Sequence, residues 1–86
     1  MKVRLEMTRP ALKDLARLDR ITRERVVAAL ERLTQHPETV DLKKLEGTTD
    51  IWRYRVGDWR VILRFDREKG ILYVLHVKHR REAYRG

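Results

Sequence analysis

Hydrophobic and polar residues at the start of the chain first alternate and then change to helical spacing. Residues 2–6 (KVRLE) alternate polar and apolar, which predicts a short strand. From Leu12 onward apolar residues recur at the spacing of one helix face, which predicts a first helix near 9–18. Thr8 is its expected N-cap, because a threonine hydroxyl can accept a hydrogen bond from a backbone N–H of the first turn.

A second helix is predicted over residues 20–35. Asp19 is a suitable cap, apolar residues line one face, and Pro37 ends the helical pattern. Because so few residues separate the two helices, we expect them to form a helical hairpin.

Three alternating runs follow a predicted loop over 38–50. They are 51–56 (IWRYRV), 59–65 (WRVILRF) and 71–77 (ILYVLHV), and Gly57-Asp58 between the first two suits a two-residue hairpin turn. The predicted order is β-α-α-β-β-β, which is an α+β fold with a small antiparallel sheet and the helical hairpin packed on one face. The final segment, 78–86, is basic and has no clear period.

The parity of the strand residues predicts which side chains share a face of the sheet. Successive residues of a strand point to opposite faces. One set is almost entirely apolar and is expected to face the helices. Its aromatic members are Trp52, Tyr54, Trp59 and Tyr73.

The opposite set is basic. It contains Arg53, Arg55, Arg60 and Arg64, with His76 nearby and Arg80 just beyond the last strand. No acidic residue on the same strand face offsets these arginines. Two interpretations are open. The face binds the phosphate groups of a phosphate-bearing polymer, or it is solvated and the arginine stems cover Ile62 and Val74.

The charge of the chain favours the first interpretation. There are 21 Lys+Arg against 13 Asp+Glu, a net charge of +8, and residues 43–86 alone carry +6. Arginine predominates in that half, and its planar guanidinium can hold a phosphate through two parallel hydrogen bonds. A polyanion is the expected partner, nucleic acid before a membrane surface, unless the charge serves only to keep the protein soluble.

Composition also excludes several classes of site. The chain has no cysteine, which excludes disulfides, thiolate metal sites and a cysteine nucleophile. His36, His76 and His79 are not spaced as a zinc site, so no metal and no cofactor are expected. No apolar run approaches the roughly 18 residues of a membrane span, and the first residues are too charged for a signal peptide. We expect a single cytoplasmic domain over residues 1–86 that has no membrane partner.

Three short motifs carry a family resemblance. They are a K-L-x-G loop (Lys44, Leu45 and Gly47), an R-x-G-D-[WY]-R-V hairpin over 55–61, and H-R-R-x-x-Y over 79–84. In this order and spacing the chain resembles the RelE/ParE superfamily of toxins from type II toxin–antitoxin systems, over essentially its whole length. The resemblance implies the RelE-like microbial RNase fold.

Members of the RelE branch cut mRNA in the ribosomal A site. The resemblance therefore implies a metal-independent endoribonuclease (an mRNA interferase) that inhibits translation, with the substrate's own 2′-OH as nucleophile. The candidate catalytic residues are Arg53, Arg55, Arg60, Arg80, Tyr84 and His79. Further RNA contacts are expected from Lys43, Lys44, Arg64, Lys78 and Arg81, although the lysines of the loop could also simply be solvated.

The identity of the general base stays open. Well-studied relatives have lysines where this chain has Arg53 and Arg55, and arginine is effectively never deprotonated. Tyr84 is a candidate base if nearby arginines lower its pKa, or it stacks on a base of the mRNA. His79 is a second candidate, with a structural role at a strand end as the alternative.

The resemblance also implies a cognate antitoxin, with an acidic or amphipathic segment, beside the ribosome and mRNA as partners. Two other functions remain open. Toxins of the ParE branch share the fold and poison DNA gyrase without a nuclease site, but they usually lack the complete set of arginines and tyrosine. A non-catalytic RNA- or DNA-binding module would bind in a salt-dependent way and cleave nothing.

Overall fold

The computed structural model describes residues 3–45, 47 and 50–83. Its elements are, in order, β1 (Arg4–Met7), α1 (Arg9–Arg17), α2 (Arg20–Gln35), the 3-10 turn η1 (Pro37–Thr39), β2 (Leu42–Lys44), β3 (Ile51–Val56), β4 (Trp59–Asp66), β5 (Ile71–His79) and α3 (Arg80–Ala83). This confirms the predicted β-α-α-β-β-β order. Three elements are additional: η1 follows α2, β2 lies within the predicted loop, and α3 directly follows the last strand, which is longer than predicted.

The strands form one five-stranded sheet in the order β1-β5-β4-β3-β2. Strands β2 to β5 pair antiparallel, and β1 adds a parallel strand at the β5 edge. Gly57 in the β3–β4 turn adopts a φ of +59°, the left-handed conformation that a tight hairpin turn of this kind requires.

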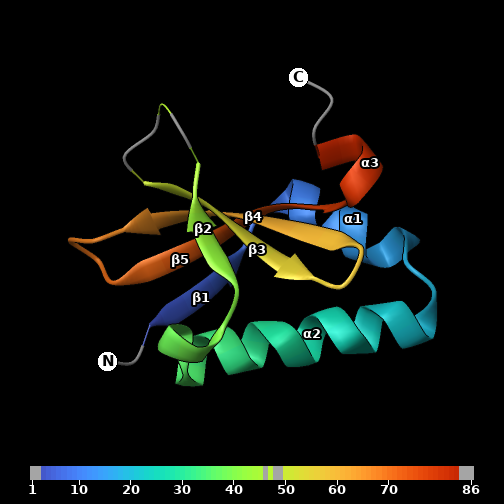
Figure 1. Ribbon diagram of the computed structural model, residues 1–86, viewed down its shortest axis with the longest axis horizontal. Helices are drawn as coiled ribbons and strands as arrows, with labels where there is room; N and C mark the ends of the chain where they lie inside the picture. The colour runs from blue at the N-terminus through green and yellow to red at the C-terminus, as the bar shows by residue number, and fades with distance from the viewer. Residues whose placement is uncertain (1–2, 46, 48–49, 84–86) are drawn as a thin grey trace.

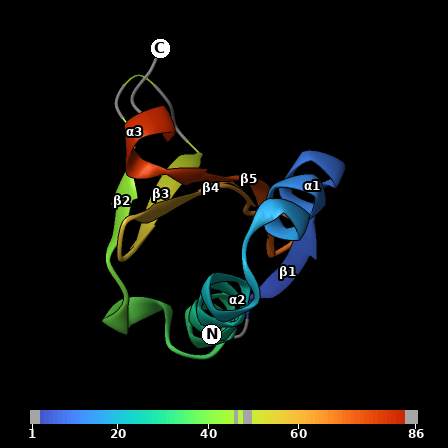
Figure 2. The same cartoon turned by 90° about the vertical axis from the view of Figure 1, so that its right-hand side faces the viewer.

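The two long helices have different positions on the sheet (Figures 1 and 2). Helix α2 lies across one face, where its buried residues Val26, Leu30 and Leu33 join Val61 and Leu63 of β4 in the hydrophobic core. Helix α1 lies against β5 and begins where β1 ends. None of the helices in the described ranges is both long and apolar enough to cross a membrane.

Predicted caps hold both helices. The Thr8 hydroxyl accepts from the Ala11 N–H and donates to the Val74 carbonyl at 2.6 Å, so it joins the start of α1 to β5. Asp19 accepts from the Thr22 N–H at 3.2 Å. The tight connection between the helices is closed by Arg23, whose guanidinium donates to the carbonyls of Leu15 and Leu18.

A bulge in β5 changes which of its residues face the core. Ile62 pairs with His76, but the next residue of β4 pairs with Val74, so Leu75 has no partner position. Val74 and Leu72 are therefore buried in the core, and Tyr73 lies on the other face, opposite Arg64. The predictions that Tyr73 belongs to the core and that arginine stems cover Val74 are wrong. Tyr54 is buried as predicted, with Trp52 and Trp59 packed against the core.

Candidate functional site

The face of the sheet opposite α2 carries most of the predicted site residues in three rows across the strands. One row runs through Lys43, Arg53, Ile62 and His76. A second runs through Arg55, Arg60 and Lys78, and a third through Ile51, Arg64 and Tyr73. We call these residues the basic face. Because neighbouring strands lie about 5 Å apart, the basic side chains of each row lie within reach of one bound nucleotide chain.

Arg60 lies in the expected row, but its guanidinium is not exposed. The residue is only 7% exposed, and its Nη1 donates to the carbonyls of Gly57 at 2.8 Å and Trp59 at 2.9 Å. Nε of Arg60 is buried without a hydrogen-bond partner among the described residues. In this conformation Arg60 holds the β3–β4 turn in place.

Two of the other predicted arginines are paired with aspartates. Nε of Arg55 lies 2.7 Å from Oδ2 of Asp41, which immediately precedes β2. Nε of Arg80 lies 3.9 Å from Oδ1 of Asp58 in the β3–β4 turn, and the Arg80 N–H donates to the Asp58 carbonyl at 2.8 Å. The expectation covered only acidic residues on the strands themselves, and it did not foresee that Asp41 and Asp58, which lie outside the strands, pair with arginines of the site.

Arg64 stacks on Tyr73. Its guanidinium carbon lies 4.7 Å from the centre of the Tyr73 ring, a distance typical of a cation–π contact. The two side chains come from neighbouring strands and stand on the basic face. A guanidinium on an aromatic ring offers a flat surface on which an unpaired nucleobase can stack.

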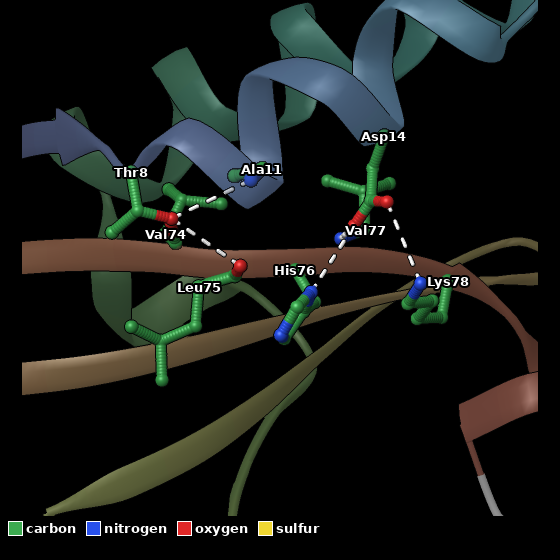
Figure 3. A network of polar contacts seen from close by, with 8 residues as sticks. All are labelled: Thr8, Ala11, Asp14, Val74, Leu75, His76, Val77 and Lys78. Carbon is green, nitrogen blue, oxygen red and sulfur yellow. Dashed lines mark hydrogen bonds and ion pairs between the residues drawn. The ribbon is translucent and has the colours of Figure 1, made fainter.

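A buried carboxylate joins helix α1 to the edge of the basic face (Figure 3). Oδ2 of Asp14 accepts the Val77 N–H at 2.9 Å and lies 3.4 Å from Nδ1 of His76. Oδ1 of the same carboxylate lies 3.5 Å from Nζ of Lys78. Burial acts to raise the pKa of Asp14, but the Val77 N–H, the Lys78 ammonium and the His76 ring lower it, and the net pKa lies below its ordinary value.

The C-terminal candidates are divided between the two sides of the sheet. His79 is opposite Trp59, and the two rings meet edge to face at 5.4 Å. Its Nδ1 accepts the Arg81 N–H at 3.3 Å, so the ring caps the start of α3 and is turned away from the basic face. Helix α3 lies on the side of the sheet opposite α2 (Figure 2), with Arg80 and Arg81 exposed in its first turn. Tyr84 lies outside the described residues.

The two predicted lysines of the loop belong to β2 and differ in orientation. Lys43 pairs with Arg53 and faces the basic side, whereas Lys44 pairs with Trp52 and has the opposite parity. Both side chains are exposed. Lys44 lines an open groove of about 610 Å³ together with Asp50, Arg64 and Asp66 at the end of the sheet.

Sequence reasoning missed Asp14 and Tyr73 as members of this site. Asp14 had a detectable signal, because it lies at helical spacing between Ala11 and Leu18, on the face of α1 that becomes buried. No sequence signal identifies Tyr73, because nothing in residues 71–77 marks the position of a bulge that would change its face. In the described ranges no three His, Asp or Glu side chains gather as a metal site.

Comparison with known proteins relates the whole chain to bacterial and archaeal toxins. The model of a family described as "ParE toxin of type II toxin-antitoxin system, parDE" matches residues 5–84. The protein named RelE1 of Methanocaldococcus jannaschii is 31% identical over 99% of this chain and 98% of its own length. The archaeal RelE–RelB complex of Pyrococcus horikoshii OT3 contains a chain that is 30% identical, with full coverage of both chains and a TM-score of 0.77.

A free mutant of the Escherichia coli toxin RelE has a TM-score of 0.79 over 96% of this chain and 88% of its own. At 22% identity this likeness supports the fold alone. The predicted RelE-like fold is thereby confirmed.

Proposed function

The chain belongs to the ParE toxin family of type II toxin–antitoxin systems, and from this premise we propose that it cleaves mRNA on the ribosome and so inhibits translation. The observation that carries the proposal is the basic face, where the register brings Arg53, Arg55 and Arg64 onto one side of the sheet. Two relatives with 30% identity or more over nearly the full chain carry the name RelE, which favours this branch over gyrase inhibition.

The proposed reaction forms no covalent bond to the protein, so its main requirement is positive charge around the phosphate that is attacked. The 2′ oxygen attacks the adjacent phosphorus and the bond from phosphorus to the 5′ oxygen breaks, which leaves a 2′,3′-cyclic phosphate and a 5′-OH. A donor that is already fixed where negative charge develops contributes on the order of 3–4 kcal/mol to such a step. Arg53 and Arg80 are the proposed donors.

The ion pairs of the face have a role in this scheme. In the free protein Asp41 orients the guanidinium of Arg55 and Asp58 orients that of Arg80. When RNA binds, each arginine exchanges its aspartate for a phosphate oxygen. Arg60 acts as a positioning residue, since its guanidinium donates to the carbonyls of Gly57 and Trp59, the two residues on either side of Asp58. Lys43, Lys78 and Arg81 add contacts to the RNA backbone that do not depend on base sequence.

The proposal includes a cognate antitoxin and a cytoplasmic location. The Pyrococcus horikoshii relative was solved as a complex of RelE with RelB, and this chain's basic face suits a partner segment that carries carboxylates. Ribosomes and mRNA, the proposed targets, lie in the cytoplasm.

Primer extension on programmed ribosomes tests the proposed activity. The purified chain is added to ribosomes with a defined mRNA, and new 5′ ends are mapped beside an Arg53→Gln/Arg80→Gln variant and ribosome-free RNA. We expect new ends in the A-site codon with the wild type and at least a 100-fold slower reaction with the variant. Arg20→Gln is the matched control, because Arg20 is exposed on α2 and pairs only with Glu24 among the described residues.

A parallel supercoiling assay with DNA gyrase tests the alternative that the family name suggests. Inhibition of gyrase without any cleavage of mRNA would contradict the proposal. It would assign the protein to the gyrase-directed branch and leave its arginines as binding residues. Salt-dependent RNA binding with neither activity would instead indicate a non-catalytic module.

A further inference from the structure

Asp14 and His76 form a pair in which one partner is buried and the other reaches the surface. The side chain of Asp14 is 9% exposed and that of His76 is 46% exposed. Asp14 is fixed by three contacts, to the Val77 N–H, to Nζ of Lys78 and to Nδ1 of His76. Figure 3 shows Nδ1 of His76 turned toward the carboxylate and the other ring nitrogen pointing away from it.

This pairing selects one tautomer of the imidazole. An ionised carboxylate has only acceptor sites, and the net lowering of its pKa keeps Asp14 ionised at neutral pH. Nδ1 of a neutral His76 must therefore carry the hydrogen that points to Asp14. Nε2 then holds the lone pair, and a histidine with this arrangement is prepared to accept a proton from a group in front of Nε2.

The ring of His76 belongs to the face where RNA is proposed to bind. His76 stands in the row Lys43–Arg53–Ile62–His76, so Ile62 lies between it and Arg53 across the strands. Arg53 and His76 are two strands apart, which is about 10 Å between backbones. A phosphate above Ile62 would lie between the Arg53 guanidinium and the His76 ring.

We propose that His76 is the general base of the cleavage reaction and that Asp14 is the positioning residue that orients it. The inference rests on the proposed nuclease function and assigns a base, which the arginines cannot supply. Nε2 takes the proton of the 2′-OH as the 2′ oxygen bonds to phosphorus. The bond to the 5′ oxygen breaks, this oxygen takes a proton from water, and His76 then returns its proton to the solvent.

Several charged groups around His76 bear on any pH dependence of the reaction. Asp14 of α1 contacts it directly, and Lys78 of β5 contacts the same Asp14 carboxylate. Arg53 and Lys43 lie in its row, and the neighbouring rows on the same face contribute Arg55, Arg60 and Arg64. The pKa of Asp14 lies below its ordinary value, so its carboxylate stays ionised between pH 5 and 8. Of the residue types in this set, histidine is the one whose ordinary side-chain pKa falls within that interval.

Single-turnover cleavage of A-site mRNA between pH 5 and 8 tests this assignment. We expect the wild-type rate constant to rise with pH, and His76→Gln to be about 100-fold slower with no such rise. Added imidazole should restore part of the activity of His76→Gly. Asp14→Asn should slow cleavage at least about tenfold, and adding this change to His76→Gln should slow the reaction no further.

His36→Gln is the matched control, because His36 is 63% exposed at the end of α2 and contacts Glu38. Circular dichroism and thermal unfolding of each variant establish that it is folded at the assay temperature. A His76→Gln enzyme with the wild-type rate and pH profile would overturn the assignment of the base and leave the nuclease function standing. A wild-type protein that cuts no mRNA would overturn both.

Discussion

The carboxylate of Asp14 accepts the backbone N–H of Val77 at 2.9 Å, across 63 residues of sequence. Strand β1 pairs with β5 only as far as Val74, so beyond that residue the edge of β5 needs another partner. Two side chains provide these hydrogen bonds. Thr8, the N-cap of α1, bonds the Val74 carbonyl, and Asp14 within α1 bonds the Val77 N–H. The same helix therefore closes the sheet edge and reaches the basic face.

Loss of the Asp14 carboxylate should destabilise the fold in a pH-dependent way. Asp14→Ala leaves the buried Val77 N–H without its acceptor, which costs about 1–3 kcal/mol in free energy of unfolding. Because the folded-state pKa of Asp14 is lowered, its ionised form stabilises the protein above the unfolded pKa of about 3.9, and this contribution is lost as pH falls through the folded value.

Urea denaturation at pH 7 and at pH 3 measures both effects. The difference between wild type and Asp14→Ala should be larger at pH 7 than at pH 3. Glu31→Ala, which removes an exposed carboxylate of α2, controls for the loss of negative charge elsewhere. Equal stability of wild type and Asp14→Ala at pH 7 would show that the contact to Val77 does not support the fold.

Arg60 should behave as a structural residue as well as a functional one. Its guanidinium joins two carbonyls of the β3–β4 turn and is buried, so Arg60→Ala should lower the free energy of unfolding by about 1.5–3 kcal/mol. Arg55 directly opposite is exposed and paired with Asp41, and Arg55→Ala should cost at most about 1 kcal/mol. Chemical denaturation of the two variants compares them, and an Arg60→Ala protein as stable as Arg55→Ala would contradict this role.

Tyr73 should contribute to RNA binding through its ring. Tyr73→Leu removes the surface on which Arg64 lies and should weaken binding of a single-stranded oligonucleotide by about 1–3 kcal/mol, whereas Tyr73→Phe should bind normally. Fluorescence anisotropy with a labelled oligonucleotide at several salt concentrations measures the affinity. The salt dependence should not change, since no charge is removed. Wild-type affinity of Tyr73→Leu would exclude a stacking role.

Local sequence signals predicted much of the fold. Both helix caps, both helix bodies and the three long strands lie close to where periodicity placed them, because each depends on neighbours a few residues away. The parallel pairing of β1 with β5 depends on residues almost seventy positions apart, and no local pattern specifies it. Strand β2 is only three residues long and, as an edge strand, pairs with β3 on one side, so its short sequence is indistinguishable from a loop.

The site was predicted less completely, for two physical reasons. The bulge at Leu75 shifts the parity of β5, and with it Tyr73 and Val74 exchange the faces that alternation assigns to them. Side-chain partners also come from distant elements: Asp41 on Arg55, Asp58 on Arg80 and Asp14 on His76. Parity placed Arg53, Arg60 and Arg64 on one face, but it could not show that the Arg60 guanidinium folds into the turn.

The chemistry of the cleaved ends tests the central claim most directly. Programmed ribosomes receive either an all-ribose mRNA or the same mRNA with a 2′-deoxy nucleotide on the 5′ side of the cleaved bond. We predict that the wild-type chain cuts only the all-ribose mRNA and that the products carry a 2′,3′-cyclic phosphate and a 5′-OH. Cleavage of the deoxy substrate, or products with a 3′-OH and a 5′-phosphate, would contradict attack by the substrate's 2′-OH on the basic face.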